Sequence, residues 1–95
     1  MEFEWDPDKA EENLTKHGVG FVEASTIFSD PLEVTIPDPE RRDDEVRFLS
    51  LGLSVDGRLL VVAYTEREGT IRIIHARVAA PKERRTYESG QKSKD

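Results

Sequence analysis

The stretch RLLVVAYTEREGTIRIIHAR, residues 58–77, decides the fold. It holds two apolar runs rich in β-branched residues, which favour strands, and Glu68-Gly69 between them indicates a tight hairpin turn. Asp56-Gly57 marks another turn just before this stretch, and a third apolar run precedes that turn. These patterns predict an antiparallel meander of three strands, at residues 46–54, 58–67 and 70–77.

The last of these strands does not alternate cleanly. With a strict period of two, both of its faces would mix apolar and charged side chains. A β-bulge near Ile73 and Ile74 would repair the pattern, because one extra residue reverses the facing of everything beyond it. The side chains that would then face inward are Ile71, one of these two isoleucines and Ala76. Those that would project together from the other face are Arg72, His75 and Arg77.

Before the meander, the sequence predicts a short strand and a helix. EFEW alternates, with Phe3 and Trp5 on one side. Asp6 suits a helix N-cap and Pro7 the first helical position, so a helix is expected through residue 17, with Gly18 at its C-terminal end. The stripe that this helix would bury consists of Ala10, Leu14 and His17.

The remaining elements complete an α+β domain. A second short helix is predicted over residues 20–28, and residues 32–36, flanked by prolines, suit an edge strand. Pro81 would begin a last helix that Gly90 would end. The predicted order is β-α-α-β-β-β-β-α, in a single domain over residues 1–90 with a flexible tail at 91–95.

Composition narrows the class of protein. The 95 residues carry a net charge of −6 and no cysteine, which excludes disulfides and thiolate metal sites. Residues 1–57 hold five basic against 15 acidic side chains, whereas residues 58–95 hold nine against five, so only the last third is basic. No segment resembles a signal peptide or a membrane span, and a cytoplasmic protein without membrane contact is expected.

The basic third offers candidate functional residues. Outward arginines on a strand suit phosphate binding, although they could equally be a solvated face paired with Glu66 or Glu68. Three more cations follow on the last helix: Lys82, Arg84 and Arg85. On the same helix, Tyr87 could stack on a base, transfer a proton, or simply dock the helix onto the sheet.

The two histidines and one acidic run complete the candidates. His17 lies in the last turn of its helix and could bind the terminal carbonyls, whereas His75 is better placed to carry a proton. The acidic run Asp43, Asp44 and Glu45 lacks the spacing of a calcium loop, so no metal site is predicted. No cofactor-binding motif is present, and no cofactor is expected.

Several motifs, in their order and spacing, resemble one family. FEWD, KHGV, GRLLVV, a strand ending in HAR, and ERRTYE follow one another over about residues 3 to 88. This set is similar to the BrnT family of bacterial toxins. The resemblance implies a RelE-like fold, with an antiparallel sheet that carries helices. It also implies an endoribonuclease that arrests translation until a BrnA-like antitoxin neutralises it. Such antitoxins carry a ribbon-helix-helix DNA-binding part, so DNA would be contacted only through the antitoxin.

The resemblance also implies which residues act. The positions that match the family are Arg47, Arg58, Arg72, Arg77, Glu83, Arg84, Tyr87 and His17. His75 stands where the family commonly has serine, so the resemblance does not make it the obligatory base. Metal-free RNA cleavage needs cations for the phosphate, for which Arg72 and Arg77 are the first candidates, helped by Arg47 or Arg84. The groups left open for proton transfer are His17, His75, Glu66, Glu83, Tyr87 and water.

A second class of function fits the same residues. The basic strand and helix could belong to a noncatalytic module that grips a partner protein or helps a partner to bind DNA. RNA cleavage distinguishes the two hypotheses, because a pure docking module would have no cleavage to lose when Arg77 is replaced by alanine.

Overall fold

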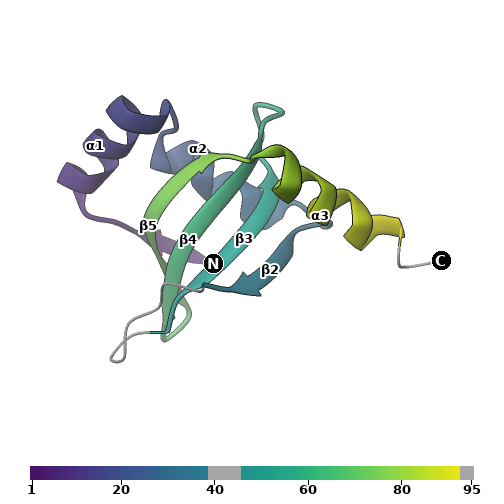
Figure 1. Cartoon of the computed structure of the whole chain (residues 1–95). Coiled ribbons are helices and arrows are strands. Elements are labelled where there is room, and N and C mark those ends of the chain that lie inside the picture. Colours follow the sequence, from purple (N-terminus) through teal and green to yellow (C-terminus); the bar gives the residue numbers. More distant parts are fainter. Residues whose placement is uncertain (39–45, 93–95) are drawn as a thin grey trace.

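The computed structural model describes residues 1–38 and 46–92, the last two by their backbone alone (Figure 1). Its elements, in chain order, are β1 (Glu2–Glu4), α1 (Pro7–His17), α2 (Phe21–Ser25), the 3-10 helix η1 (Thr26–Ser29), β2 (Val34–Pro37), β3 (Phe48–Leu53), β4 (Leu59–Arg67), β5 (Thr70–Val78) and α3 (Pro81–Lys92). The acidic run at 43–45, which the sequence did not predict to bind a metal, lies outside the described residues.

The five described strands form one sheet in the order β1-β5-β4-β3-β2. Strands β2 to β5 are antiparallel neighbours, as the meander predicts, but β1 runs parallel to β5. The prediction of a wholly antiparallel sheet is therefore wrong. The three residues of β1 pair with Thr70, Ile71 and Arg72 at the far end of the chain, and no local turn specifies the direction of such a pairing. Strand β2 lies at the other edge, as its flanking prolines predict.

The predicted bulge in β5 is confirmed. Ala63 pairs with His75 and the next residue, Tyr64, pairs with Ile73, so Ile74 is the extra residue. The three side chains predicted to face inward are buried: Ile71, Ile73 and Ala76. Because of this single unpaired residue, the charged side chains on both sides of the bulge share the opposite, outer face.

The inner face of the sheet carries the core. Its apolar side chains pack with Phe21, Ala24 and Ile27 of α2 and η1, which lie behind the sheet in Figure 1. Gly52 of β3 leaves room for this packing, because a Cβ atom there would lie 2.8 Å from Cβ of Ile27. The outer face is covered at the β2 side by α3, so the part of it along β5 is left for other use (Figure 1).

Helix α1 begins and ends as predicted, and Ala10 packs against the core as predicted, but the other two residues of the predicted stripe do not. Asp6 caps its first turn through the amides of Asp8 and Lys9, and Gly18 ends it at a φ of 68°. Leu14 is 54% exposed, and His17 is exposed too. The buried residue of α1 is Asn13, because the helix lies beside the edge of β5 and contacts that strand's backbone.

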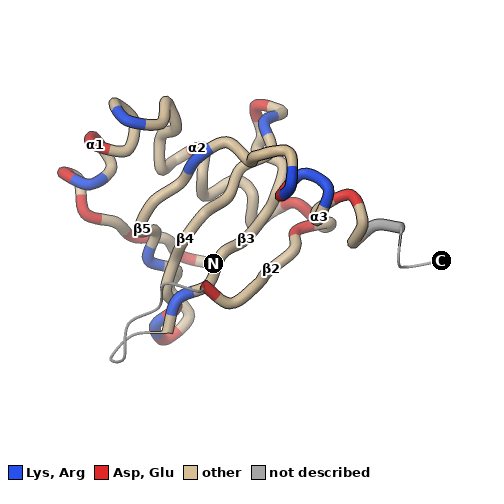
Figure 2. Tube along the Cα trace, in the orientation of Figure 1, with Lys and Arg blue, Asp and Glu red and all other residues tan. Residues whose placement is uncertain are grey.

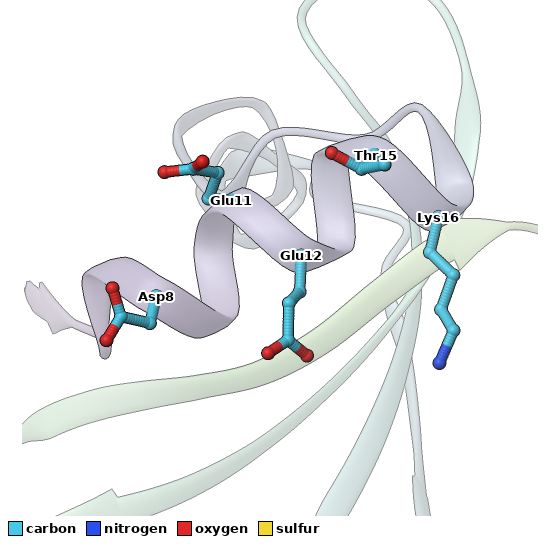
Figure 3. A pocket seen from close by; sticks show the side chains of 5 residues that line it. All are labelled: Asp8, Glu11, Glu12, Thr15 and Lys16. Atoms are coloured by element: carbon cyan, nitrogen blue, oxygen red, sulfur yellow. The ribbon is translucent and has the colours of Figure 1, made fainter.

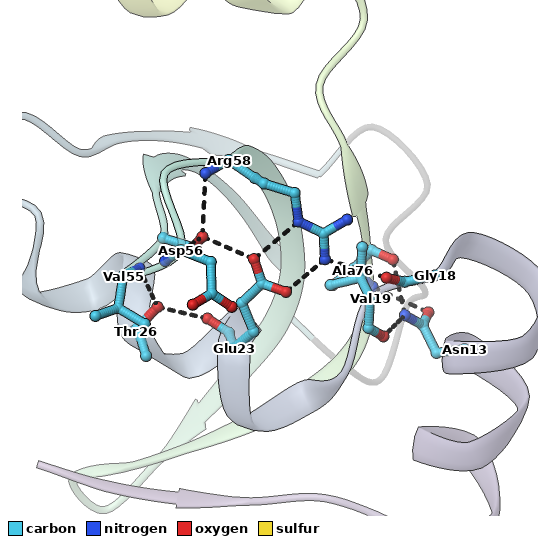
Figure 4. A network of polar contacts seen from close by, with 10 residues as sticks. Asn13, Gly18, Val19, Glu23, Thr26, Val55, Asp56, Arg58 and Ala76 are labelled. Carbon is cyan, nitrogen blue, oxygen red and sulfur yellow. Dashed lines mark hydrogen bonds and ion pairs between the residues drawn. The ribbon is translucent and has the colours of Figure 1, made fainter.

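Asn13 replaces a missing strand. β1 covers β5 only as far as Arg72, which leaves the amide and carbonyl of Ala76 open at the edge. The Asn13 side chain accepts from the Ala76 amide at 3.1 Å and donates to the Ala76 carbonyl at 2.8 Å, as a neighbouring strand would. It also donates to the Val19 carbonyl at 2.9 Å and so joins three segments of the chain (Figure 4).

Predictions based on glycine residues concern the turn between β4 and β5 and the carboxyl end of α3. Glu68 and Gly69 have φ values of 50° and 85°, the left-handed pair that a two-residue hairpin turn requires. Helix α3 begins at Pro81 as predicted but continues through Gly90 to Lys92. The prediction that Gly90 ends this helix is wrong, because its missing side chain admits Val34, whose Cγ2 would lie 3.3 Å from a Cβ atom.

Candidate functional site

A groove follows the outer face of β5, between that strand and α1. It consists of two adjoining hollows, which we call the Arg77 hollow and the Arg72 hollow. The Arg77 hollow, of about 410 Å³, is lined by Lys9, Glu12, Asn13, Lys16, His17, Ile74, His75 and Arg77. The Arg72 hollow, of about 150 Å³, is lined by Asp6, Lys9, Arg47, Arg72, Ile73 and Ile74. Lys9 and Ile74 belong to both hollows, so the groove is continuous along the strand.

His75 lies in the Arg77 hollow with its side chain partly buried. Burial lowers the pKa of His75 below its ordinary value, because the charged imidazolium is the form that loses most by leaving water. Asp38 opposes this shift, whereas the positive charges of Arg77, His17 and Arg47 add to it. His75 is therefore neutral at pH 7 and able to accept a proton.

Arg77 is held in place by Glu83 of α3. Its two terminal nitrogens donate to the two carboxylate oxygens at 2.7 and 2.6 Å, and Glu83 also accepts the Ala80 amide at 2.8 Å. Hydrogen bonding to Arg77 is the main cause of the lowered pKa of Glu83. The side chain of Arg77 nevertheless remains 37% exposed and lines the open hollow, so a phosphate can reach it.

Arg72 has a carboxylate partner as well. Its Nη1 donates to Glu4 of β1 at 2.9 Å, and both side chains are well exposed. The partners of Arg72 and Arg77 are thus Glu4 and Glu83, not the predicted Glu66 or Glu68. An exposed pair of this kind contributes on the order of 0.5 kcal/mol, so it does not prevent an anion from binding.

Basic side chains outnumber acidic ones along the groove. Among the described residues, the Arg77 hollow has three side chains that keep a positive charge at neutral pH, Lys9, Lys16 and Arg77, against one carboxylate, Glu12. The Arg72 hollow adds Arg47 and Arg72 against Asp6, and the blue segments of Figure 2 follow β5 at both ends. Although the whole chain has a net charge of −6, the local excess of positive charge makes this surface attract anions.

The adjoining surface of α1, which shares Glu12 and Lys16 with the Arg77 hollow, has the reverse charge. A hollow of about 470 Å³ there is lined by Asp8, Glu11, Glu12, Thr15 and Lys16 (Figure 3). Figure 3 shows Glu12 and Lys16 extending from one side of the helix and Glu11 from the other. Three carboxylates against one ammonium group repel phosphate, so α1 separates an acidic surface from a basic one.

Arg58 does not belong to the groove. Its guanidinium binds both carboxylate oxygens of Glu23 on α2, and Nη2 donates to the Gly18 carbonyl at 3.1 Å (Figure 4). Ser54 donates to the same carboxylate at 2.7 Å. The prediction that Arg58 binds a ligand is not supported by this geometry, because these contacts use it to join the β3–β4 turn to α2.

The candidates on α3 lie apart from both hollows. Tyr87 donates its hydroxyl to Asp30 at 2.7 Å, which docks the helix against the turn before β2. The three predicted cations of this helix are exposed and line neither hollow: Lys82, Arg84 and Arg85. Glu66 is also exposed and outside the groove. Of the predicted residues, the groove therefore brings together His17, Arg47, Arg72, His75 and Arg77.

Sequence reasoning missed two lysines of the groove. Lys9 and Lys16 stand seven residues apart with Asn13 between them, so all three share one helical face. That spacing is visible in the sequence, but a helical face without an apolar residue gives no sign that it lies against a strand. Within the described residues, no three His, Asp or Glu side chains are grouped to hold a metal ion.

Comparison with known proteins places this groove in context. Residues 5–83 match the sequence model of the ribonuclease toxin BrnT of type II toxin-antitoxin systems, which is most of the chain. The chain belongs to the BrnT family. It is therefore an endoribonuclease toxin of a type II toxin-antitoxin system, with RNA as its substrate and an antitoxin as its partner.

One solved structure gives independent support for the fold of this BrnT-family toxin. A crystal structure of the Brucella abortus ribonuclease toxin, BrnT, superposes with a TM-score of 0.62 at 22% sequence identity. The match covers 84% of this chain and 97% of the Brucella chain. A comparison with curated proteins found no match. None of the described helices is both long and apolar enough to cross a lipid bilayer.

Proposed function

We propose that this toxin cleaves RNA in the Arg77 hollow, without a metal ion, by attack of a ribose 2′-hydroxyl on the adjacent phosphate. The observation that carries the proposal is the presence of His17, His75 and Arg77 around one open hollow. Such a reaction needs a proton acceptor, a proton donor and fixed positive charge, and these three side chains can supply them.

Each residue has one role in the proposed step. Neutral His75 takes the proton of the 2′-hydroxyl, whose oxygen forms a bond to phosphorus. The bond from phosphorus to the 5′-oxygen breaks, and His17, exposed at the end of α1, donates a proton to that oxygen. The products are a 2′,3′-cyclic phosphate and a 5′-hydroxyl, with no oxidant or further reactant required.

Arg77 stabilises the additional negative charge of the transition state. Guanidinium keeps its proton at every physiological pH, so it can bind charge but cannot act as the acid or base. A strong contact of this type contributes about 3 kcal/mol to the transition state. The phosphate competes with Glu83 for the same guanidinium, and Lys9 and Lys16 add charge from the facing helix.

Glu83 and Tyr87 have positioning roles in this proposal. Glu83 holds the guanidinium of Arg77 and the first turn of α3 together, and Tyr87 fixes the middle of the same helix. Both groups were candidates for proton transfer on sequence grounds. Their contacts with Arg77 and Asp30 instead favour His17 and His75 as the groups that move protons.

The wider setting follows from the family resemblance. We place this toxin among RelE-like folds and expect it to arrest translation in the cytoplasm by cutting RNA. Its antitoxin would be BrnA-like, with a ribbon-helix-helix part that alone contacts DNA. The hollow lined by Asp8, Glu11 and Glu12 repels phosphate, which leaves the basic groove as the place where such a partner would block the substrate.

The test is cleavage of a mixed-sequence oligoribonucleotide in excess EDTA, with the product ends identified by mass spectrometry. Wild type should give 2′,3′-cyclic phosphate ends, and His75→Gln and Arg77→Ala should each lower kcat/KM by about 100-fold or more. Arg85→Ala, an exposed cation outside the groove, is the matched control. Cleavage that requires a divalent ion, or that survives His75→Gln unchanged, would contradict the mechanism.

A further inference from the structure

The groove is longer than the site of one phosphate. Arg72 and Arg77 share the outer face of β5 and are five residues apart, which corresponds to about 15 Å along a strand. Only the Arg77 hollow contains the histidines that the proposed cleavage uses. The Arg72 hollow therefore has cations but no proton-transfer group from the proposed mechanism, as expected of a site that binds without reacting.

The Arg72 hollow has the composition of an anion site. Lys9, Arg47 and Arg72 line it from three different segments, and Asp6 is the one carboxylate that the described part of the chain contributes to the lining. Asp6 already accepts the amides of Asp8 and Lys9 as the cap of α1, so part of its charge is compensated. Glu4 binds Arg72 from the exposed side and leaves its other nitrogens available.

A buried hydroxyl lies on the strand next to Arg72. Thr65 is the cross-strand partner of Arg72 and is only 3% exposed. Its Oγ1 has no hydrogen-bond partner among the residues that the structure describes. An unpaired buried hydroxyl costs on the order of 1–3 kcal/mol, and it is commonly satisfied by a bound water or ligand.

Ile74 separates the two hollows. It is the extra residue of the bulge, it is partly exposed, and it lines both hollows. An apolar side chain between two cationic sites offers a contact to a ribose or base, not to a phosphate. In a duplex the bases are paired and turned away from the protein, so this contact selects a single strand.

We propose that the groove binds single-stranded RNA through two phosphates that have one further phosphate between them, the scissile one in the Arg77 hollow and the other in the Arg72 hollow, with the intervening nucleotides against Ile74. This inference rests on the proposed function for the identity of the reacting hollow. It assigns Arg72 to substrate positioning, and it makes the bulge the feature that sets the spacing of the two phosphates.

The test uses 2′-O-methyl RNA, which binds but cannot be cleaved, of mixed sequence and labelled for fluorescence anisotropy. One phosphate at a time is replaced by a neutral methylphosphonate, and each probe is measured with wild type, Arg72→Gln and Arg85→Ala. Neutralising one position should weaken binding to wild type and to Arg85→Ala by about 10-fold. The same replacement should have little further effect on Arg72→Gln, because the lost phosphate and the lost guanidinium are partners.

The other outcomes are decisive. If every methylphosphonate weakens Arg72→Gln as much as wild type, or if duplex RNA binds as tightly as a single strand, the proposal is wrong. Cleavage of matched 2′-hydroxyl RNA is measured in parallel. Retained coupling without cleavage would overturn the proposed function alone, since binding across two phosphates does not depend on the reaction. Thermal unfolding of each variant verifies that the fold is intact.

Discussion

Arg77 and Glu83 are joined by two parallel hydrogen bonds, of 2.7 and 2.6 Å, and the same carboxylate caps the first turn of α3. One ion pair thereby connects the last strand, the last helix and the candidate site. The arrangement resembles a capping box, in which a glutamate three residues into a helix accepts the amide of the N-cap residue.

Replacing Glu83 by Gln should lower the free energy of unfolding by about 1 kcal/mol at pH 7, since the pair is partly exposed to water. The pKa of Glu83 is lowered in the folded state, so its stabilising effect is complete above the ordinary pKa of glutamate and is lost as the pH falls through the lowered value. Urea titrations at pH 7 and at about pH 3 should therefore show the difference between wild type and variant shrinking in acid. A difference independent of pH would contradict this account, and Glu88→Gln, exposed on the same helix, is the control.

Replacement by alanine should destabilise the protein more at the polar residue Asn13 than at the apolar residue Leu14, although an apolar residue is usually the more costly one to truncate. Asn13→Ala leaves the amide and carbonyl of Ala76 and the carbonyl of Val19 without their partner, and it should cost about 2–4 kcal/mol. Leu14→Ala removes a side chain that is 54% exposed and should stay within about 0.5 kcal/mol of wild type. Denaturant midpoints at constant m-value measure both. A larger loss at Leu14 than at Asn13 would show that α1 packs through the apolar stripe.

His75 should make the protein less stable in mild acid. Its pKa is lowered in the folded state, so the unfolded chain binds a proton more readily, and stability falls as the pH drops below the ordinary histidine pKa of about 6.5. His75→Gln cannot take up this proton, so its stability should change less than that of wild type between pH 7.5 and about pH 5. Chemical denaturation across this range is the measurement. Equal pH dependence in the two proteins would mean that His75 is not desolvated, and His17→Gln serves for comparison.

Much of the fold was visible in local sequence. The hairpin turn depends on Glu68-Gly69, the start of α1 on Asp6-Pro7 and its end on Gly18, and each acts on its immediate neighbours. The bulge at Ile74 was predictable for a different reason. If side chains alternated strictly between the two faces of the strand, the two buried isoleucines could not face inward while Arg72 and Arg77 both faced outward. A single extra residue makes both possible.

The rest depends on contacts between distant residues. Asn13 is buried because it meets Ala76, 63 positions away, and no pattern within α1 reveals that partner. Glu4 pairs with Arg72 across 68 positions for the same reason. Gly90 was assigned to a helix end from its residue type, whereas the packing of Val34 explains it. Arg72 and Arg77 share one face of β5 as predicted, but their carboxylate partners required the tertiary structure.

The placement of α1 beside β5 has a consequence for the order of events during synthesis. The groove is lined by residues 6–17, by Arg47 and by residues 72–77, so a chain that ends before residue 77 lacks part of the site. A nascent chain therefore cannot form the groove until β5 has been synthesised and has paired with β4. Synthesis of residues 72–77 is thus the step that allows an RNA-binding groove to form.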